Sequence, residues 1–126
     1  MPKVSIIIAT YNRARFLGEC LESIVGQAYP DLEVLVIDDG STDETAQIVT
    51  PFCPPVRYLR QENQGEYKAK NRGISLSSGE YIRFVDSDDV MLDGLEEQIA
   101  LLDAHPRVAS STARHGQSMK EESSWL

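Results

Sequence analysis

Short apolar runs recur along this chain and are separated by segments with helical spacing. The runs predict four β-strands, at residues 4–9, 32–37, 56–61 and 81–85. The first reads Val-Ser-Ile-Ile-Ile-Ala, and a continuous aliphatic run of this kind is typical of a strand buried on both faces of a parallel sheet. The third is weaker, because Arg57 and Arg60 lie in it.

Helical periodicity follows each of these runs. Apolar residues from Phe16 to Val25 recur at i, i+1 and i+4, a spacing that places them on one face of a helix. Asn12 is the expected cap of this helix, and Gly26 is its expected end. Ser41 and Glu44 match a capping box, which predicts a second helix reaching about residue 52.

Two further helices are predicted. One occupies the second half of the stretch 63–77, and the other follows from Leu92, Leu95, Ile99 and Leu102 and ends before Pro106. Strand and helix thus alternate four times, which predicts the α/β class with a three-layer, mostly parallel sheet. Residues 108–112 are a candidate fifth strand. We expect residues 1–112 to form the domain and residues 113–126 an irregular tail.

Composition and charge limit the class of protein and its possible partners. A chain of 126 residues with 41% hydrophobic residues predicts one soluble domain. The 12 basic residues against 20 acidic ones, a net charge of −8, argue against a nucleic-acid partner. Cys20 and Cys53 lack a metal or redox spacing, so both are expected to be reduced and packed. No run is long enough for a membrane span and the start is no signal peptide, so the expected localisation is cytoplasmic, with a peripheral position at the inner membrane face left open for the intact protein.

Carboxylates follow two of the predicted strands. Asp38 and Asp39 end the second, and Asp86-Ser87-Asp88-Asp89 ends the fourth. The carboxyl ends of parallel strands open into the crevice where ligands bind. Carboxylates at alternate positions repel one another unless a hard divalent cation neutralises them, and such a cation attracts phosphate oxygens. An alternative of equal weight is that Asp88, Asp89 and Asp93 only begin the next helix.

One segment is locally basic. It spans residues 63–73 and carries Lys68, Lys70 and Arg72. These side chains could offset a bound anion, or they could form a solvated helix face, since Lys68 and Arg72 lie one turn apart.

Several short motifs, taken together, resemble the nucleotide-binding half of family-2 inverting glycosyltransferases of the GT-A fold. They are the stretches 9–12 (Ala-Thr-Tyr-Asn), 36–43 (Val-Ile-Asp-Asp-Gly-Ser-Thr-Asp), 63–65 (Asn-Gln-Gly), 70–73 (Lys-Asn-Arg-Gly) and 79–89 (Gly-Glu-Tyr-Ile through Asp-Ser-Asp-Asp). Their order and spacing make the resemblance specific. It runs from about residue 3 to residue 109, and we expect the acceptor-binding C-terminal half of the fold to be missing.

The resemblance implies a donor site. Ala9 and Tyr11 match positions that hold the base and ribose, and Thr10 and Asn12 join them in the expected donor-binding set. Asp39 matches the carboxylate that accepts from the imide NH of uracil or thymine, with Asp38 as a structural neighbour.

A loop and a metal site complete the implied set. Gly65 matches the loop that passes close to the base. Asp88 is expected to ligate Mg²⁺ or Mn²⁺, Asp86 to act through the ribose or a metal-bound water, and Ser87 to contact the donor. Lys70 stands where the family often has Arg, and a lysine cannot make the planar bidentate contact of a guanidinium.

The implied activity is transfer of a hexose, with inversion, from a UDP- or dTDP-linked sugar to a saccharide, lipid or other hydroxyl acceptor. No catalytic residue is identifiable, because the family places its general base in the later half. An incomplete domain would expose apolar surface, so we expect self-association.

Three other classes share some of these features. The first is a truncated, non-catalytic nucleotide-binding module. Only downstream sequence or a measurement of activity would distinguish it from a glycosyltransferase. A phosphoacceptor signalling domain would carry its acidic pair after the first strand, where this chain has Thr10-Tyr11-Asn12. A dinucleotide-binding fold would need Gly-x-Gly-x-x-Gly at that place.

Overall fold

The computed structural model describes residues 3–92 and 94–104. The strands are β1 (Val4–Thr10), β2 (Leu32–Asp38), β3 (Val56–Arg60) and β4 (Tyr81–Phe84). The helices are α1 (Ala14–Val25), α2 (Thr45–Val49), the short 3-10 helix η1 (Thr50–Phe52), α3 (Glu66–Leu76) and α4 (Leu95–Ala104). The predicted fifth strand at 108–112 and the predicted tail at 113–126 lie outside the described residues.

The four strands form one parallel sheet in the order β3-β2-β1-β4. The central strand β1 pairs with β2 from Val4↔Leu32 to Thr10↔Asp38 and with β4 from Val4↔Tyr81 to Ile7↔Phe84. This register brings the carboxyl ends of β1, β2 and β4 to the same edge. The predicted α/β class with a parallel sheet is therefore confirmed.

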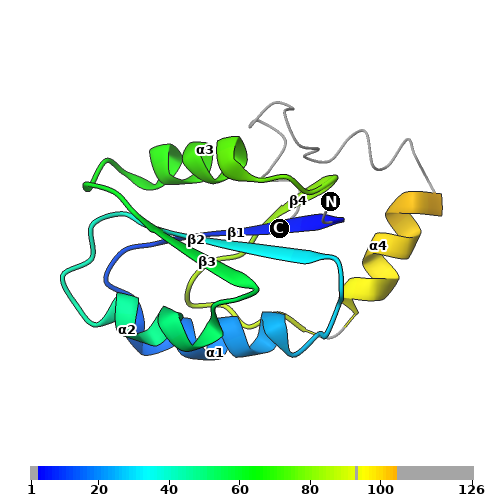
Figure 1. Ribbon diagram of the computed structural model, residues 1–126, viewed down its shortest axis with the longest axis horizontal. Helices are drawn as coiled ribbons and strands as arrows, with labels where there is room; N and C mark the ends of the chain where they lie inside the picture. Colours follow the sequence, from blue (N-terminus) through cyan, green and yellow to red (C-terminus); the bar gives the residue numbers. More distant parts are fainter. Residues whose placement is uncertain (1–2, 93, 105–126) are drawn as a thin grey trace.

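Helices cover both faces of the sheet, with α3 on one side and α1 and α2 on the other (Figure 1). Alternate side chains of β1 pack on opposite faces of the sheet. Ile6 and Ile8 belong to the core that includes α1 and α4, and Ile7 belongs to the smaller core under α3. All three are fully buried, as expected for a strand covered on both faces.

Close packing holds α3 against the centre of the sheet. A Cβ added at Gly73 would lie 2.5 Å from Cγ2 of Ile7. A side chain here would push the helix away from β1, so glycine sets the distance between them. This contact also positions the first turn of α3, which carries cleft residues.

The predicted N-caps of α1 and α2 are wrong, whereas Gly26 ends α1 as predicted. Arg13 and Glu44 occupy the N-cap positions, and neither makes a side-chain cap. Asp43 supplies this contact instead, because its carboxylate accepts hydrogen bonds from the backbone N of Ala14 (3.2 Å) and of Thr45 (3.1 Å). Asp43 thus binds the start of α1 from a neighbouring loop and the start of α2 from two residues upstream, which leaves Asn12 and Ser41 for other contacts.

The two cysteines differ. Cys20 is buried in the core between α1 and the loop after β4, as predicted, and its thiol donates to the carbonyl O of Asp86 at 3.6 Å. Cys53 is exposed, so the prediction that it is packed is wrong. It follows η1 and precedes two prolines, and its thiol donates to the carbonyl O of Val49 in α2 at 3.7 Å.

Among the helices of the described part, none is long and apolar enough to cross a membrane. Large apolar side chains are exposed at Leu92 (82%) and Leu101 (57%). Self-association of the chain stays a prediction.

Candidate functional site

A cleft of about 380 Å³ opens at the edge where β1, β2 and β4 end. The residues that line it come from these strand ends and from the start of α3: Ala9, Thr10, Tyr11, Arg13, Asp39, Glu66, Ala69, Asp86, Ser87 and Asp88. The parallel register explains the grouping, because segments far apart in sequence leave the sheet side by side.

Asp39 is a carboxylate held in place by the protein. Its Oδ1 accepts hydrogen bonds from Gln61 Nε2 (2.8 Å) and from the backbone N of Gln64 (2.9 Å), and its Oδ2 accepts one from the backbone N of Gly65 (2.9 Å). The residue is only 5% exposed. Burial acts to raise the pKa of Asp39, but the three hydrogen bonds outweigh it and hold the pKa below its ordinary value. The side chain is therefore a fixed, ionised acceptor at the cleft.

Asp38 is turned into the protein. It is fully buried, accepts a hydrogen bond from the hydroxyl of Tyr58, and lies 3.6 Å from Nη1 of Arg60. Its Oδ1 also accepts from the backbone N of Ser41 at 2.9 Å. Asp38 does not line the cleft, and these bonds anchor the turn after β2 that carries Asp39. Its expected role as a structural neighbour agrees with this placement.

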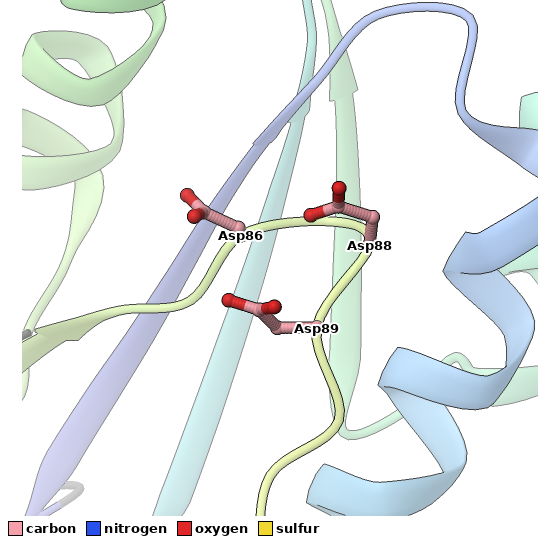
Figure 2. A group of neighbouring side chains, drawn as sticks. All are labelled: Asp86, Asp88 and Asp89. Atoms are coloured by element: carbon pink, nitrogen blue, oxygen red, sulfur yellow. The ribbon is translucent and has the colours of Figure 1, made fainter.

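Three carboxylates gather on the loop that follows β4. Figure 2 shows Asp86, Asp88 and Asp89, and one ligand oxygen from each lies within 4.8 Å of the others. The described residues provide no hydrogen-bond donor to these three side chains. Because α4 begins only at Leu95, Asp88 and Asp89 do not begin a helix; Asp93 lies outside the described residues.

Electrostatic repulsion marks this acidic cluster. Partial burial raises the pKa of Asp86, and the charges of Asp89, Glu66 and Asp88 raise it further, while Lys70 lowers it. Carboxylate oxygens are the ligands that Mg²⁺ and Mn²⁺ prefer. The three carboxylates are exposed, and together they have the ligand chemistry of a divalent-cation site.

Cys20 lies against the same loop. Burial raises the pKa of its thiol to about 12, with further contributions from Asp89, Asp88 and Asp86. The thiol stays protonated at neutral pH and acts as a small core residue, so it is no nucleophile.

Seven of the ten predicted site residues line the cleft, and Asn12, Gly65 and Lys70 do not. Gly65 adopts a φ of +103°, which favours glycine, and its amide serves Asp39. Lys70 forms an ion pair with Glu66 (2.9 Å), and its Nζ lies 5.4 Å from the centre of the Phe84 ring. The i,i+4 pair explains why the locally basic helix does not present all its charge to the cleft.

Four residues at the site were missed from the sequence. Arg13, Glu66 and Ala69 line the cleft, and Asp89 joins the acidic cluster. Asp89 belongs to the predicted acidic run, and Glu66 directly follows the predicted site residue Gly65. Their position next to predicted site residues could have indicated both of them. Nothing local distinguishes Arg13 or Ala69.

Thr10 has an unusual hydroxyl. The residue is 3% exposed and lines the cleft, and its Oγ1 has no hydrogen-bond partner among the described residues. Its backbone O accepts from Asp39 N at 2.9 Å, so the main chain at Thr10 extends the pairing of β1 with β2.

Comparison with known proteins places this arrangement in a family. The model of glycosyl transferase family 2 matches residues 5–126. The chain belongs to this family. The resemblance inferred from the motifs is therefore confirmed, but its expected end near residue 109 is wrong, because the family match continues through a stretch that carries no motif.

Relatives and solved structures agree with the family. The glycosyltransferase GlyG of Streptococcus pneumoniae is 42% identical over 109 residues, which are 80% of this chain and 36% of GlyG. The crystal structure of S. aureus TarS 1-349 in complex with UDP-GlcNAc has a TM-score of 0.79 and 35% identity over 82% of this chain and 32% of that one. The mannosyltransferase PcManGT of Pyrobaculum calidifontis, in complex with GDP-Man and Mn²⁺, has a TM-score of 0.65 and 32% identity over 71% of this chain and 28% of that one.

These matches identify the fold of the chain as that of GT-A glycosyltransferases. The family-2 chain described here spans about a third of the length of these proteins.

Proposed function

We propose that this chain is the donor-binding half of an inverting glycosyltransferase of the hexosyltransferase type, which binds a UDP- or dTDP-linked sugar together with Mg²⁺ or Mn²⁺. One observation carries the proposal. A single cleft is bordered by a fixed acceptor, Asp39, and by carboxylates of the acidic cluster, Asp86 and Asp88. These two features suit the two ends of a nucleoside diphosphate, its base and its phosphates.

The hydrogen bonds of Asp39 favour a base with one imide NH. A carboxylate offers about four acceptor positions, and three hydrogen bonds from the protein already occupy Asp39. The remaining position suits the single N3–H of uracil or thymine. Guanine presents two donors side by side and would leave one unmatched, which costs affinity. The side chain of Tyr11, 46% exposed at the cleft, offers a ring face against which a base can stack.

The acidic cluster suits the metal and the diphosphate. Asp88 would be the direct ligand, with Asp86 acting directly or through water, and the observed geometry adds Asp89. A bound divalent cation would neutralise charge on the departing nucleoside diphosphate. TarS with UDP-GlcNAc and PcManGT with GDP-Man and Mn²⁺ support a nucleotide-sugar donor and, for PcManGT, a metal. Ser87 and the backbone at Ala9 and Thr10 complete the donor surface.

The reaction that we propose for the intact protein is a displacement at the anomeric carbon. The hydroxyl oxygen of a saccharide, lipid or other acceptor forms the new bond as the bond to the phosphate oxygen breaks, and a base takes the hydroxyl proton. Among the described residues, none is assigned as that base. A non-catalytic nucleotide-binding module is the second candidate, and it is not favoured because the relatives are named as transferases.

Calorimetric titration of UDP into the chain with Mn²⁺, and again with a chelator, tests the proposal. We expect saturable binding that requires the metal, weaker binding of GDP, and loss of at least tenfold in affinity in Asp88→Ala. Asp31→Ala is the matched control, because this exposed acid precedes β2 at the opposite edge of the sheet. A folded wild-type chain that binds no nucleotide, or binds UDP equally well without metal, would contradict the proposal.

A further inference from the structure

Two loops at the cleft are joined by hydrogen bonds that the donor site itself does not use. The loop after β1 carries Tyr11, and the loop after β2 carries Asp39. The last paired residues of the two strands are Thr10 and Asp38. The ladder continues by one more bond, from the backbone N of Asp39 to the backbone O of Thr10 (2.9 Å), and beyond it side-chain contacts determine how the loops lie relative to each other.

Asp43 makes one of these contacts, by accepting from the backbone N of Ala14. Asn12, Ser41 and Thr42 make the others, and we call these three residues the loop clasp. The backbone N of Asn12 donates to Ser41 Oγ at 2.8 Å. In the other direction, the backbone N of Thr42 donates to Asn12 Oδ1 at 2.8 Å, and the hydroxyl of Thr42 donates to the same oxygen at 3.4 Å. The two loops therefore exchange hydrogen bonds reciprocally, as strands do within the sheet.

The backbone conformation of Asn12 makes this exchange geometrically accessible. Asn12 has a φ of +51°, in the left-handed region that asparagine tolerates better than most residues. A residue held there indicates that its surroundings require the conformation. The turn at Asn12 directs its amide and its side-chain oxygen to the second loop, directly after Tyr11.

The arrangement does not favour direct contact between Asn12 and a donor. Asn12 does not line the cleft, and its Oδ1 already accepts from Thr42. Ser41 is 2% exposed, and its backbone N is bonded to the buried Asp38. The clasp thus lies outside the cleft, with Asn12 and Thr42 exposed and Ser41 buried, and links the loop of Tyr11 to the anchored turn that carries Asp39.

We infer that Asn12 is a positioning residue that, through Ser41 and Thr42, sets the separation between the ring of Tyr11 and the carboxylate of Asp39 and so determines affinity for the nucleoside part of the donor. This inference rests on the proposed donor site. It replaces the direct binding role expected for Asn12 from the family motif with an indirect one. The acidic cluster lies on a different loop, so the clasp should affect nucleotide binding and leave binding of the metal alone unchanged.

The test combines four variants of the chain with two titrations, UDP in the presence of Mn²⁺ and Mg²⁺ alone. Asn12→Gly keeps the positive φ and removes the side-chain acceptor, and Ser41→Ala removes the acceptor of the Asn12 amide. We expect each to weaken UDP about tenfold and to change Mg²⁺ affinity less than twofold. Asn12→Asp keeps an acceptor and tolerates the same φ, so it should restore UDP binding to within about threefold of wild type.

Gln47→Ala is the matched control. This exposed residue of α2 belongs neither to the cleft nor to the loop clasp, so UDP affinity should change less than twofold. Unchanged UDP binding in folded Asn12→Gly and Ser41→Ala would overturn the inference, as would equal losses in Asn12→Asp and Asn12→Gly. Parallel loss of Mg²⁺ affinity would also overturn it, by indicating a general structural role. Failure of the wild-type chain to bind UDP would instead count against the proposed function.

Discussion

Asp39 and the acidic cluster are carboxylate sites on the same cleft, yet their surroundings are opposite. Asp39 receives three hydrogen bonds from the protein, which hold its pKa below the ordinary value. Asp86 receives none to its side chain from the described residues, and burial together with neighbouring acids holds its pKa above that value. The protein thus satisfies the carboxylate of Asp39, whereas Asp86 carries repulsion that a cation would relieve.

This difference shows what each region contributes. A carboxylate that already accepts hydrogen bonds from the protein can select a ligand through its one remaining acceptor position, and little rearrangement is needed on binding. A repulsive group stores unfavourable energy that a cation releases on binding. Base selection and metal binding are therefore separable properties of two loops, and substitutions should affect them in opposite ways.

The largest effect is expected for Asp39→Ala. Hydrogen bonds to a charged group contribute about 1.5–3 kcal/mol each and are not additive, so we expect a loss of about 3 kcal/mol in the free energy of unfolding. Chemical denaturation of the metal-free chain measures it. Glu62→Ala, at an exposed acid on the following loop, should stay within about 0.5 kcal/mol of wild type. A loss below about 1 kcal/mol for Asp39→Ala would show that the three contacts do not anchor the loop.

The second effect is stabilisation by metal. Mg²⁺ at a concentration 100 times its dissociation constant should raise the free energy of unfolding by about 2.7 kcal/mol, and chelator should reverse the change. Asp89→Asn should weaken this stabilisation, because Asp89 belongs to the acidic cluster. The same substitution should slightly stabilise the metal-free chain by relieving repulsion, the opposite sign to Asp39→Ala. Thermal unfolding with and without Mg²⁺ gives both values, and an Asp89→Asn chain that responds to Mg²⁺ like wild type would exclude Asp89 as a ligand.

The smallest effect concerns the pH at which Asp86 and Asp39 bind their protons. In the metal-free chain, Asp86 should bind its proton above the ordinary value of 3.8, and Asp39 should bind its proton below 3.8. Acidification from neutral pH therefore first removes the repulsion at Asp86, which favours the folded state. The stability contributed by Asp39 is fully present above its unfolded pKa and is lost only as pH falls through its lowered folded pKa. Carboxyl carbon chemical shifts followed by NMR would measure both, and the reverse order would contradict the electrostatic contrast.

Local pattern was sufficient for most of the fold. The strand starting at Val4 and the helix containing Cys20 follow from apolar runs and from helical spacing, which act between residues close in sequence. The helix caps could not be predicted in the same way. Asp43 caps α1 from 29 positions away, so the local candidate Asn12 was free to join the loop clasp.

The sequence by itself determined that strands and helices alternate, that acids end two of the strands, and that the motifs are those of family 2. Only the tertiary structure decided how these acids differ. The separate states of Asp39 and Asp86 depend on which donors and charges the tertiary structure brings beside them. The hydrogen bonds of Asp39 join residues more than 20 positions apart, and Glu66 and Lys70 reach Asp86 from another element, because hydrogen bonding, burial and charge act over distance in space and not along the chain.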